Sequence, residues 1–205
     1  MLDLYDYRQR VFGLYARIRA LGTDSPEAFE TFRKERDDLF AHHPQSPLDN
    51  VQKKHFAGLS YAPYDPAFRL VAPVNTQVEP VTLGIDLGTQ GAFQLRRFGQ
   101  VTVTLPTGMS TLDVYWILGY GGGIFLPFRD TTNGHTTYGG GRYLYDTIKG
   151  ADLGITGRQM VLDFNYAYHP SCAYHPRWTC PLAPPGNRLD IAIPVGEQLP
   201  RLTTG

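Results

Sequence analysis

Hydrophobic and polar positions follow two different periods along the chain. In the first 58 residues, apolar side chains recur every three or four positions, which predicts helices over 11–21 and 26–43. A third, shorter helix follows before Gly58. The run Arg33–Asp38 carries charges of both signs, so we interpret it as a solvated helix face.

Helix boundaries are marked by local signals. Ser25 precedes Pro26, the arrangement of an N-cap residue followed by proline in the first helical position. The stretch Ser46–Asp49 repeats that signal, with Ser46 as the cap and Asp49 at the capping-box position. Gly22 and Gly58 are placed where helices end.

After Tyr61 the period changes to two, which is typical of strands. Alternating or apolar runs occur at 68–72, 93–95, 101–105, 112–118, 124–128, 142–148, 159–164 and 188–193. Phe98-Gly99-Gln100 is predicted to be a hairpin turn between two of them. No helical pattern separates these runs, so parallel βαβ units are not expected.

The predicted fold is therefore mainly β (α+β): an antiparallel barrel or sandwich of eight to ten short strands with an N-terminal helical cap. We expect residues 1–60 to pack as a helical segment on the sheet of residues 61–205, as one folding unit.

Composition excludes several classes of function. The 19 Lys and Arg residues balance 19 Asp and Glu residues, so no general attraction to nucleic acid follows. No apolar run reaches the 18 residues that a bilayer requires, and no signal-peptide pattern stands at the N-terminus. The prediction is a soluble cytoplasmic protein without a membrane partner. Its oligomeric state is left open.

The tetrad Tyr-Gly-Gly-Gly occurs twice, and its two copies have different neighbours. Gly121–Gly123 lies between two apolar strands and is predicted to be a hairpin turn. Gly139–Gly141 follows the hairpin signal Asn133-Gly134, which would bring Arg129 near Arg142. Two guanidinium groups beside bare backbone N–H groups can hold a carboxylate or phosphate. The alternative is that these arginines are structural and pair with Asp130 and Asp146.

The stretch from Leu162 to Glu197 is rich in prolines, aromatic residues and polar residues, and it predicts a long ordered loop over the sheet. Four zinc-type ligands stand close together there: His169, Cys172, His175 and Cys180. Cys172 is also a candidate nucleophile, and a disulfide between Cys172 and Cys180 is sterically plausible. We favour two structural thiols, with no metal and no cofactor.

Several motifs together resemble a known family. They are FAGLSYAPYDPAFR (Phe56–Arg69), the Phe125–Leu144 stretch around RD and GRYL, and DFN with CAY and CP in Asp163–Leu189. This combination, with HPQSPL (His43–Leu48) upstream, is similar to the bacterial and archaeal family called domain of unknown function family 1684. The family is uncharacterised, so the resemblance implies signature positions but no activity. These positions are Arg129, Asp130, Gly134, Thr137, Tyr138, Gly141, Arg142, Asp163, Asn165, Tyr168, Cys172, Cys180, Pro181, Asn187 and Glu197.

The chain departs from the family pattern at His169, where asparagine is usual, and position 175 is not a signature position. That departure weakens the interpretation as a four-ligand zinc site. The resemblance also favours Gly141-Arg142 over the glycines at 139 and 140, and so favours the arginine over a backbone cradle as the group that would hold an anion.

The expected function is binding of a small polar or anionic ligand in a pocket at one end of the β domain. Arg129 and Arg142 would clamp the ligand between Tyr138 and Tyr168. The remaining candidate contacts are Asp130, Gly141, Asp163, Asn165, Asn187 and Glu197. One alternative is a hydrolytic or acid–base enzyme with Asp163 or Glu197 as base, or with Cys172 as nucleophile. Another is a protein-interaction module that presents the aromatic C-terminal loop.

Overall fold

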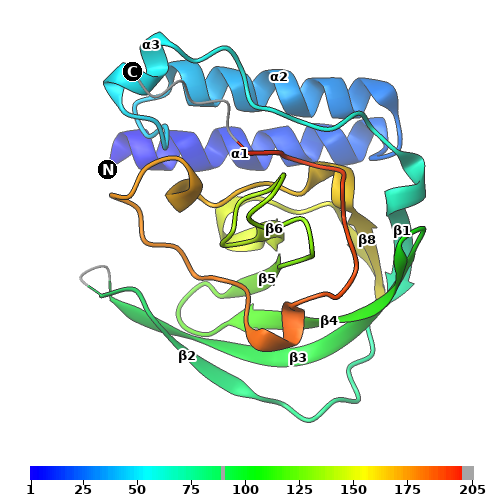
Figure 1. Cartoon of the computed structure of the whole chain (residues 1–205). Helices are drawn as coiled ribbons and strands as arrows, with labels where there is room; N and C mark the ends of the chain where they lie inside the picture. Colours follow the sequence, from blue (N-terminus) through cyan, green and yellow to red (C-terminus); the bar gives the residue numbers. More distant parts are fainter. Residues whose placement is uncertain (89–90, 200–205) are drawn as a thin grey trace.

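Three helices form the N-terminal part of the chain, as the hydrophobic period predicts. A computed structural model describes residues 1–88 and 91–199, with α1 (Leu2–Leu21), α2 (Pro26–His42) and α3 (Asn50–Lys54) at the start (Figure 1). Ser25 caps α2 by accepting a hydrogen bond of 3.0 Å from the Ala28 N–H, so the predicted cap is confirmed.

The third helix begins later than the sequence signal indicates. Its N-cap is Asp49, whose side chain accepts from the Gln52 N–H while Gln52 bonds back to the Asp49 N–H. Ser46 is used differently: its hydroxyl donates to the Phe40 carbonyl at 2.6 Å and accepts from the Leu48 N–H. Because that hydroxyl closes the end of α2, it is not free to cap α3.

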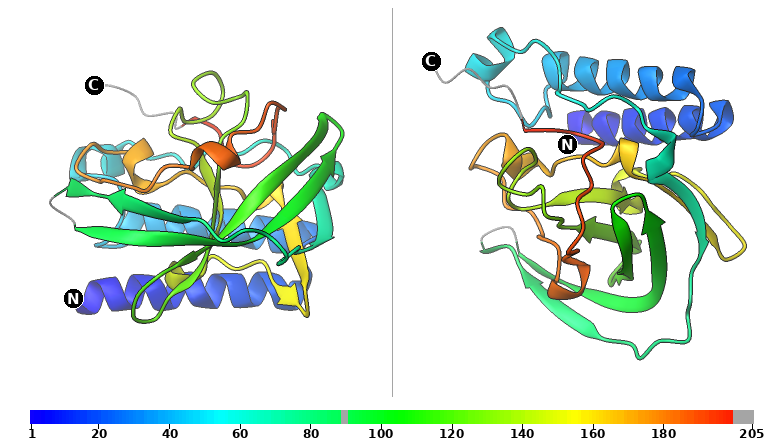
Figure 2. Two further views of the ribbon diagram at one scale, coloured as in Figure 1. Left: turned by 90° about the horizontal axis from the view of Figure 1, so that it is seen from below. Right: turned by 45° about the vertical axis from the view of Figure 1, so that its right-hand side comes forward.

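All pairs of neighbouring strands run antiparallel, and the described strands form two sheets (Figure 2). The larger sheet has the order β2-β3-β4-β5-β6, and the smaller has the order β1-β8-β7. The strands are β1 (Arg69–Pro73), β2 (Thr82–Asp86), β3 (Ala92–Leu105), β4 (Gly108–Ile117), β5 (Gly123–Phe128), β6 (Arg142–Asp146), β7 (Ile155–Thr156) and β8 (Gln159–Asp163). The predicted antiparallel fold with a helical cap is confirmed, in a sandwich-like form that does not close into a barrel.

The predicted turn at Phe98-Gly99-Gln100 is wrong. β3 continues through these residues, and its register against β4 shifts between Arg97 and Gly99, which is a β-bulge. A Cβ on Gly99 would lie 2.6 Å from the Val74 side chain, because residues 74 and 75 cross the strand there and Asn75 bonds to Gln100. The glycine permits this close approach of two backbones.

The predicted strand over 188–193 does not form either. Its backbone groups have other partners: the Leu189 N–H donates to the Arg129 carbonyl, and the Ile193 N–H donates to the Asp130 carboxylate. The hairpin at Gly121–Gly123 is confirmed, since it joins β4 to β5. β6 ends at Asp146, where the 3-10 turn η3 (Thr147–Lys149) begins.

One hydrophobic core joins the helical layer to both sheets. Ile18 of α1 and Phe32 of α2 are fully buried and belong to one cluster with Val101 and Leu112 of the larger sheet and Leu162 of the smaller one. In Figure 1 the two long helices lie side by side across one face of the strands. Burial of this shared apolar surface holds the cap on the sheets. Within the described residues, no helix combines the length and apolar character needed to cross a membrane.

Candidate functional site

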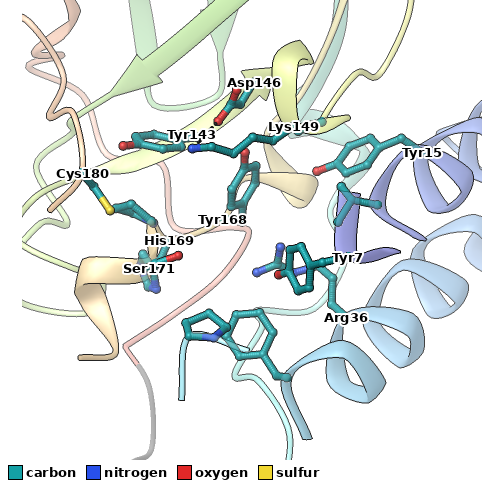
Figure 3. A pocket seen from close by; sticks show the side chains of 15 residues that line it. Tyr7, Tyr15, Arg36, Tyr143, Asp146, Lys149, Tyr168, His169, Ser171 and Cys180 are labelled. Atoms are coloured by element: carbon teal, nitrogen blue, oxygen red, sulfur yellow. Dashed lines mark ion pairs between the residues drawn. The ribbon is translucent and has the colours of Figure 1, made fainter. Parts of the chain in front are cut away.

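A cavity lies between the helical layer and the region that follows β6 (Figure 3). Its volume is about 110 Å³, counted as the space that the centre of a water molecule can reach. That is room for a small molecule. Tyrosine and phenylalanine supply five of its fifteen lining residues, and three more are charged. The lining residues are Tyr7, Val11, Tyr15, Arg36, Phe40, Pro47, Tyr143, Asp146, Lys149, Ala151, Tyr168, His169, Pro170, Ser171 and Cys180.

Arg36 reaches the cavity from the apolar face of α2. It follows Phe32 by four positions and precedes Phe40 by four, so the helix places it between two buried rings. Its guanidinium carbon lies 5.0 to 5.4 Å from the ring centroids of Phe32, Phe40 and Tyr168. Nε donates to the Tyr61 hydroxyl at 2.7 Å, and Nη1 has no hydrogen-bond partner in the described chain.

Glu197 neutralises Arg36 from behind the cavity wall. Its Oε2 accepts from Arg36 Nη2 at 2.9 Å and from the His169 N–H at 3.0 Å. The side chain is only 1% exposed. Burial raises the pKa of Glu197 to about 7, against the opposing effect of the Arg36 charge.

His169 presents a single, defined proton donor. Its Nε2 accepts a hydrogen bond from the Tyr138 N–H at 3.1 Å, so the proton of the neutral ring resides on Nδ1. Burial lowers the pKa of His169 to about 3, and the charges of Arg142 and Arg36 add to that effect, which keeps the ring neutral. Nδ1 lies 3.7 Å from Glu197 Oε1, too far for a hydrogen bond, and is without a partner.

The opposite wall carries two more buried polar atoms without partners. Asp146 uses Oδ2 in an ion pair of 3.1 Å with Lys149 Nζ, whereas its Oδ1 has no partner among the described residues. The hydroxyl of Tyr15 is likewise unpartnered, and burial raises its pKa, so it keeps its proton at neutral pH. In Figure 3 Tyr15 points from α1 toward Tyr168 and Lys149.

These groups give the cavity a defined chemistry. Arg36 Nη1, Lys149 Nζ, His169 Nδ1–H and the Tyr15 hydroxyl can donate, while Asp146 Oδ1 can only accept. Donors outnumber acceptors. The wall carries two formal positive charges and one negative charge, and Glu197 behind the wall offsets the excess. Such a wall suits a ligand that carries one acceptor-rich group and one donor.

The two arginines of the predicted anion clamp are placed elsewhere. Arg142 is 0% exposed, and its guanidinium donates to Asp130 Oδ2 at 2.8 Å, to the Ile193 carbonyl at 2.6 Å and to the Val195 carbonyl. This is the structural pairing with Asp130 that the sequence left as the alternative. Asp146, the other predicted arginine partner, pairs with Lys149 instead.

Arg129 and Gly141 lie beside each other at the two ends of the loop between β5 and β6. The Arg129 backbone bonds to Asn187 and Leu189, which fastens the C-terminal segment. Gly141 has φ +93°, and a Cβ there would collide with the Phe128 carbonyl and the Arg129 side chain. The glycine is therefore required by the backbone, not by a ligand.

The other polar residues predicted to contact a ligand form hydrogen bonds within the fold instead. Asp163 accepts from the Tyr64 hydroxyl and from Asn165, and burial raises its pKa to about 6. Asn165 and Asn187 bridge backbone groups: Asn165 bonds to both the N–H and the carbonyl of Asp65, and Asn187 does the same for Asp113. Asp163, Asn165 and Asn187 are fully buried outside the cavity wall.

The four candidate zinc ligands are not gathered around one point. His175 lies 3.5 Å from Asp49, and its Nδ1 accepts from the Arg177 N–H. His169 is committed to Tyr138 through Nε2. Cys172 and Cys180 remain free thiols close to each other. In the part of the chain that the structure describes, no group of three or more His, Cys, Asp or Glu side chains is arranged to hold a metal ion.

Sequence reasoning found part of the cavity and missed its helical half. Tyr168 was predicted as a wall residue, and Glu197 and Tyr138 lie directly behind the wall through their bonds to His169. The interpretation of 33–38 as a solvated face fails at Arg36, which is 9% exposed. A signal was present: Arg36 stands at helical spacing from Phe32 and Phe40, within the apolar stripe. The cavity residues missed by that reasoning are Tyr7, Tyr15, Arg36, Asp146 and Lys149.

Comparison with known proteins finds related sequences. The model of the family described as "Protein of unknown function (DUF1684)" matches residues 54–198. That range contains the wall from Tyr143 to Cys180, whereas α1, α2 and the motif HPQSPL precede it. No curated protein matches the chain.

A solved structure shares the fold and a related sequence. It is the solution NMR structure of an uncharacterized protein of Haloarcula marismortui, which is 30% identical to this chain. The similarity covers 84% of this chain and 92% of that one, with a TM-score of 0.60.

Proposed function

Because the chain belongs to the DUF1684 family of proteins of unknown function, its role has to be argued from its own cavity, and we propose that it binds a small polar carboxylate there. One observation carries the proposal. Three side chains of the cavity wall, Tyr15, Asp146 and His169, are each no more than 3% exposed and each keep a polar atom without a partner. A buried polar atom without a hydrogen bond costs roughly 1–3 kcal/mol, so three in one wall point to a ligand.

The balance of donors and acceptors supports a class of ligand. A carboxylate suits the donors of Arg36, His169 and Tyr15, because charge-assisted hydrogen bonds are the stronger ones. Asp146 Oδ1 requires a donor on the same ligand, such as a hydroxyl or an ammonium group. The aromatic wall and the volume of about 110 Å³ limit the size. The proposed ligand is therefore a small α-hydroxy or α-amino carboxylate, bound in the cytoplasm, where free thiols such as Cys172 and Cys180 persist.

A thermal-shift experiment with matched compounds tests this proposal. Lactate and serine carry both groups, propionate lacks the donor, lactamide lacks the charge, and inorganic phosphate supplies a different anion. A compound at 100 times its Kd stabilises the folded state by about 2.7 kcal/mol, which raises Tm by roughly 5–10 °C in a chain of this size. Lactate or serine should reach that shift at lower concentrations than propionate or lactamide.

Tyr15→Phe separates binding from stability. The substitution removes only the unpartnered hydroxyl, so the ligand-free variant should be as stable as wild type or more stable. Affinity should fall roughly tenfold through the lost contact. Tyr5→Phe on the same helix is the matched control, because Tyr5 is 64% exposed and lies outside the wall. The proposal fails if no compound of the panel stabilises wild type, or if Tyr15→Phe weakens the ligand-free fold and leaves affinity unchanged.

A further inference from the structure

Cys172 and Cys180 are brought together by a compact turn at the edge of the cavity. The turn starts at η5 (Ser171–Ala173), where the Tyr174 N–H donates to the Ser171 carbonyl at 3.1 Å. The chain then reverses, so that the Cys172 N–H donates to Cys180 Sγ at 3.3 Å. The two sulfurs are thus neighbours although seven residues separate them in sequence.

The segment Ser46–Gln52 holds this turn in place from outside. Arg177 Nη2 donates to the carbonyls of Ser46 and Leu48, each at 3.1 Å. Trp178 Nε1 donates to the Pro47 carbonyl at 3.0 Å, and Gln52 Nε2 donates to the Tyr174 carbonyl at 2.8 Å. Side-chain donors on both segments therefore fix the approach of the two cysteines in the reduced chain.

The surroundings of the two sulfurs differ. The hydroxyl of Tyr138 donates to Cys172 Sγ at 3.6 Å, and burial raises the pKa of Tyr138 to about 12, so the donor keeps its proton. Hydrogen bonds from the Cys180 thiol and from Tyr138 lower the pKa of Cys172 to about 6. The same sharing raises the pKa of Cys180. Both cysteines are partly exposed. Such a pair resembles an attacking thiolate beside a resolving thiol.

We propose that Cys172 and Cys180 form a reversible disulfide site for hydroperoxides, with Cys172 as the attacking sulfur and Tyr138 as the residue that positions and polarises it. The Cys172 thiolate attacks one peroxide oxygen: an S–O bond forms, the O–O bond breaks, and the leaving alkoxide or hydroxide takes a proton. The sulfur is oxidised to a sulfenic acid and the peroxide is reduced. Cys180 then attacks Cys172, the S–S bond forms, and the oxygen leaves as water.

The cycle closes with a dithiol reductant. Exchange with such a reductant returns both thiols and leaves the reductant as a disulfide, so the electrons balance. Cys180 also lines the cavity, so the bond forms within its wall.

The test uses the full chain, reduced and freed of reductant, with hydrogen peroxide as the probe. At pH 7, equimolar peroxide should remove two hydrogen atoms from the intact mass and link the peptides of Cys172 and Cys180. Cys180→Ser should stop at a sulfenic acid that a 1,3-diketone traps on Cys172. In Cys172→Ser, Cys180 should react at least tenfold more slowly, because an ordinary thiol with a pKa near 8.5 holds only a few per cent thiolate at pH 7.

Tyr138→Phe tests the positioning role through a pH profile. In Cys180→Ser the serine hydroxyl can still donate to Cys172 and Tyr138 remains, so alkylation of Cys172 should follow a midpoint below that of the urea-unfolded protein. The added Tyr138→Phe change should move that midpoint upward with the circular dichroism spectrum unchanged. Urea-unfolded protein, in which the two thiols should react alike, is the reference. The proposal is overturned if folded wild type forms no linkage under excess peroxide, or if the isolated Cys180 reacts as fast as the isolated Cys172.

Discussion

Replacing Arg142 by methionine should destabilise the fold strongly. The guanidinium is fully buried and donates to the Asp130 carboxylate and to the carbonyls of Ile193 and Val195. Methionine fills much of the volume but leaves a buried carboxylate without its cation and two carbonyls without a donor. Loss of one partner of a buried ion pair typically costs about 3–5 kcal/mol. That loss corresponds to a fall in Tm of roughly 6–20 °C.

Equilibrium unfolding in urea measures this effect, and two further variants locate its origin. Arg158→Met is the matched control, because Arg158 is exposed and its side chain forms no hydrogen bond or ion pair in the described chain; it should change stability by about 0.5 kcal/mol or less. Asp130→Asn combined with Arg142→Met removes the orphaned charge. The double variant should therefore be more stable than the sum of the two single changes predicts.

Arg142→Lys distinguishes a structural arginine from a ligand clamp. An ammonium group can meet Asp130, but it cannot span two separate carbonyls as the planar guanidinium does. Stability should fall by roughly 1–3 kcal/mol for each carbonyl left without a donor. If Arg142→Met or Arg142→Lys unfolds at the wild-type urea midpoint, the guanidinium does not hold the C-terminal segment, and the reasoning from its contacts is refuted.

Two further predictions concern pH and the backbone. Burial raises the pKa of Glu197 to about 7, above the value near 4.5 expected in the unfolded chain. The folded state therefore binds this proton more tightly, and the resulting stabilisation is complete below pH 4.5 and is lost as pH rises through 7. The free energy of unfolding of wild type, from urea titrations, should thus fall relative to that of Glu197→Gln between pH 5 and 7.5, by up to about 3 kcal/mol; a constant difference would contradict this. Gly141→Ala should cost more than about 3 kcal/mol, because positive φ and a clash with the Phe128 carbonyl combine. Gly134→Ala, with φ +80° in open space, should cost only about 1–2 kcal/mol, and equal losses in thermal melts would show that crowding at Gly141 is unimportant.

The sequence predicted those features that depend on which side of an element is buried. Helices and most strands can be recognised from the sequence, because their buried hydrophobic positions recur at the period of the backbone. Ser25 was identified as a cap for the same local reason. Gly99 was misread as a turn, since the need for glycine arises from Val74 and Asn75, which only the tertiary structure brings against it.

The cavity was harder to predict because its parts come from distant segments. Nothing local to Glu197 indicates that it will meet Arg36, and nothing local to Tyr15 or Asp146 indicates an unpartnered atom. The motifs around Arg142 drew attention because polar residues are dense there. In the structure, most of that polarity satisfies the backbone of a proline-rich segment that cannot pair as a strand.

The ion pair between Arg36 and Glu197 also sets an order of events in folding. Its partners are 161 positions apart, and closing a loop of that length costs about 4–5 kcal/mol of chain entropy before any contact repays it. The two long helices can form early from local contacts, with the Arg36 side chain still hydrated. Arg36 can be buried without a large desolvation cost only when Glu197 pairs with it. Glu197 is among the last of the described residues to be synthesised. We therefore expect the cavity to form late in refolding, after the helical layer.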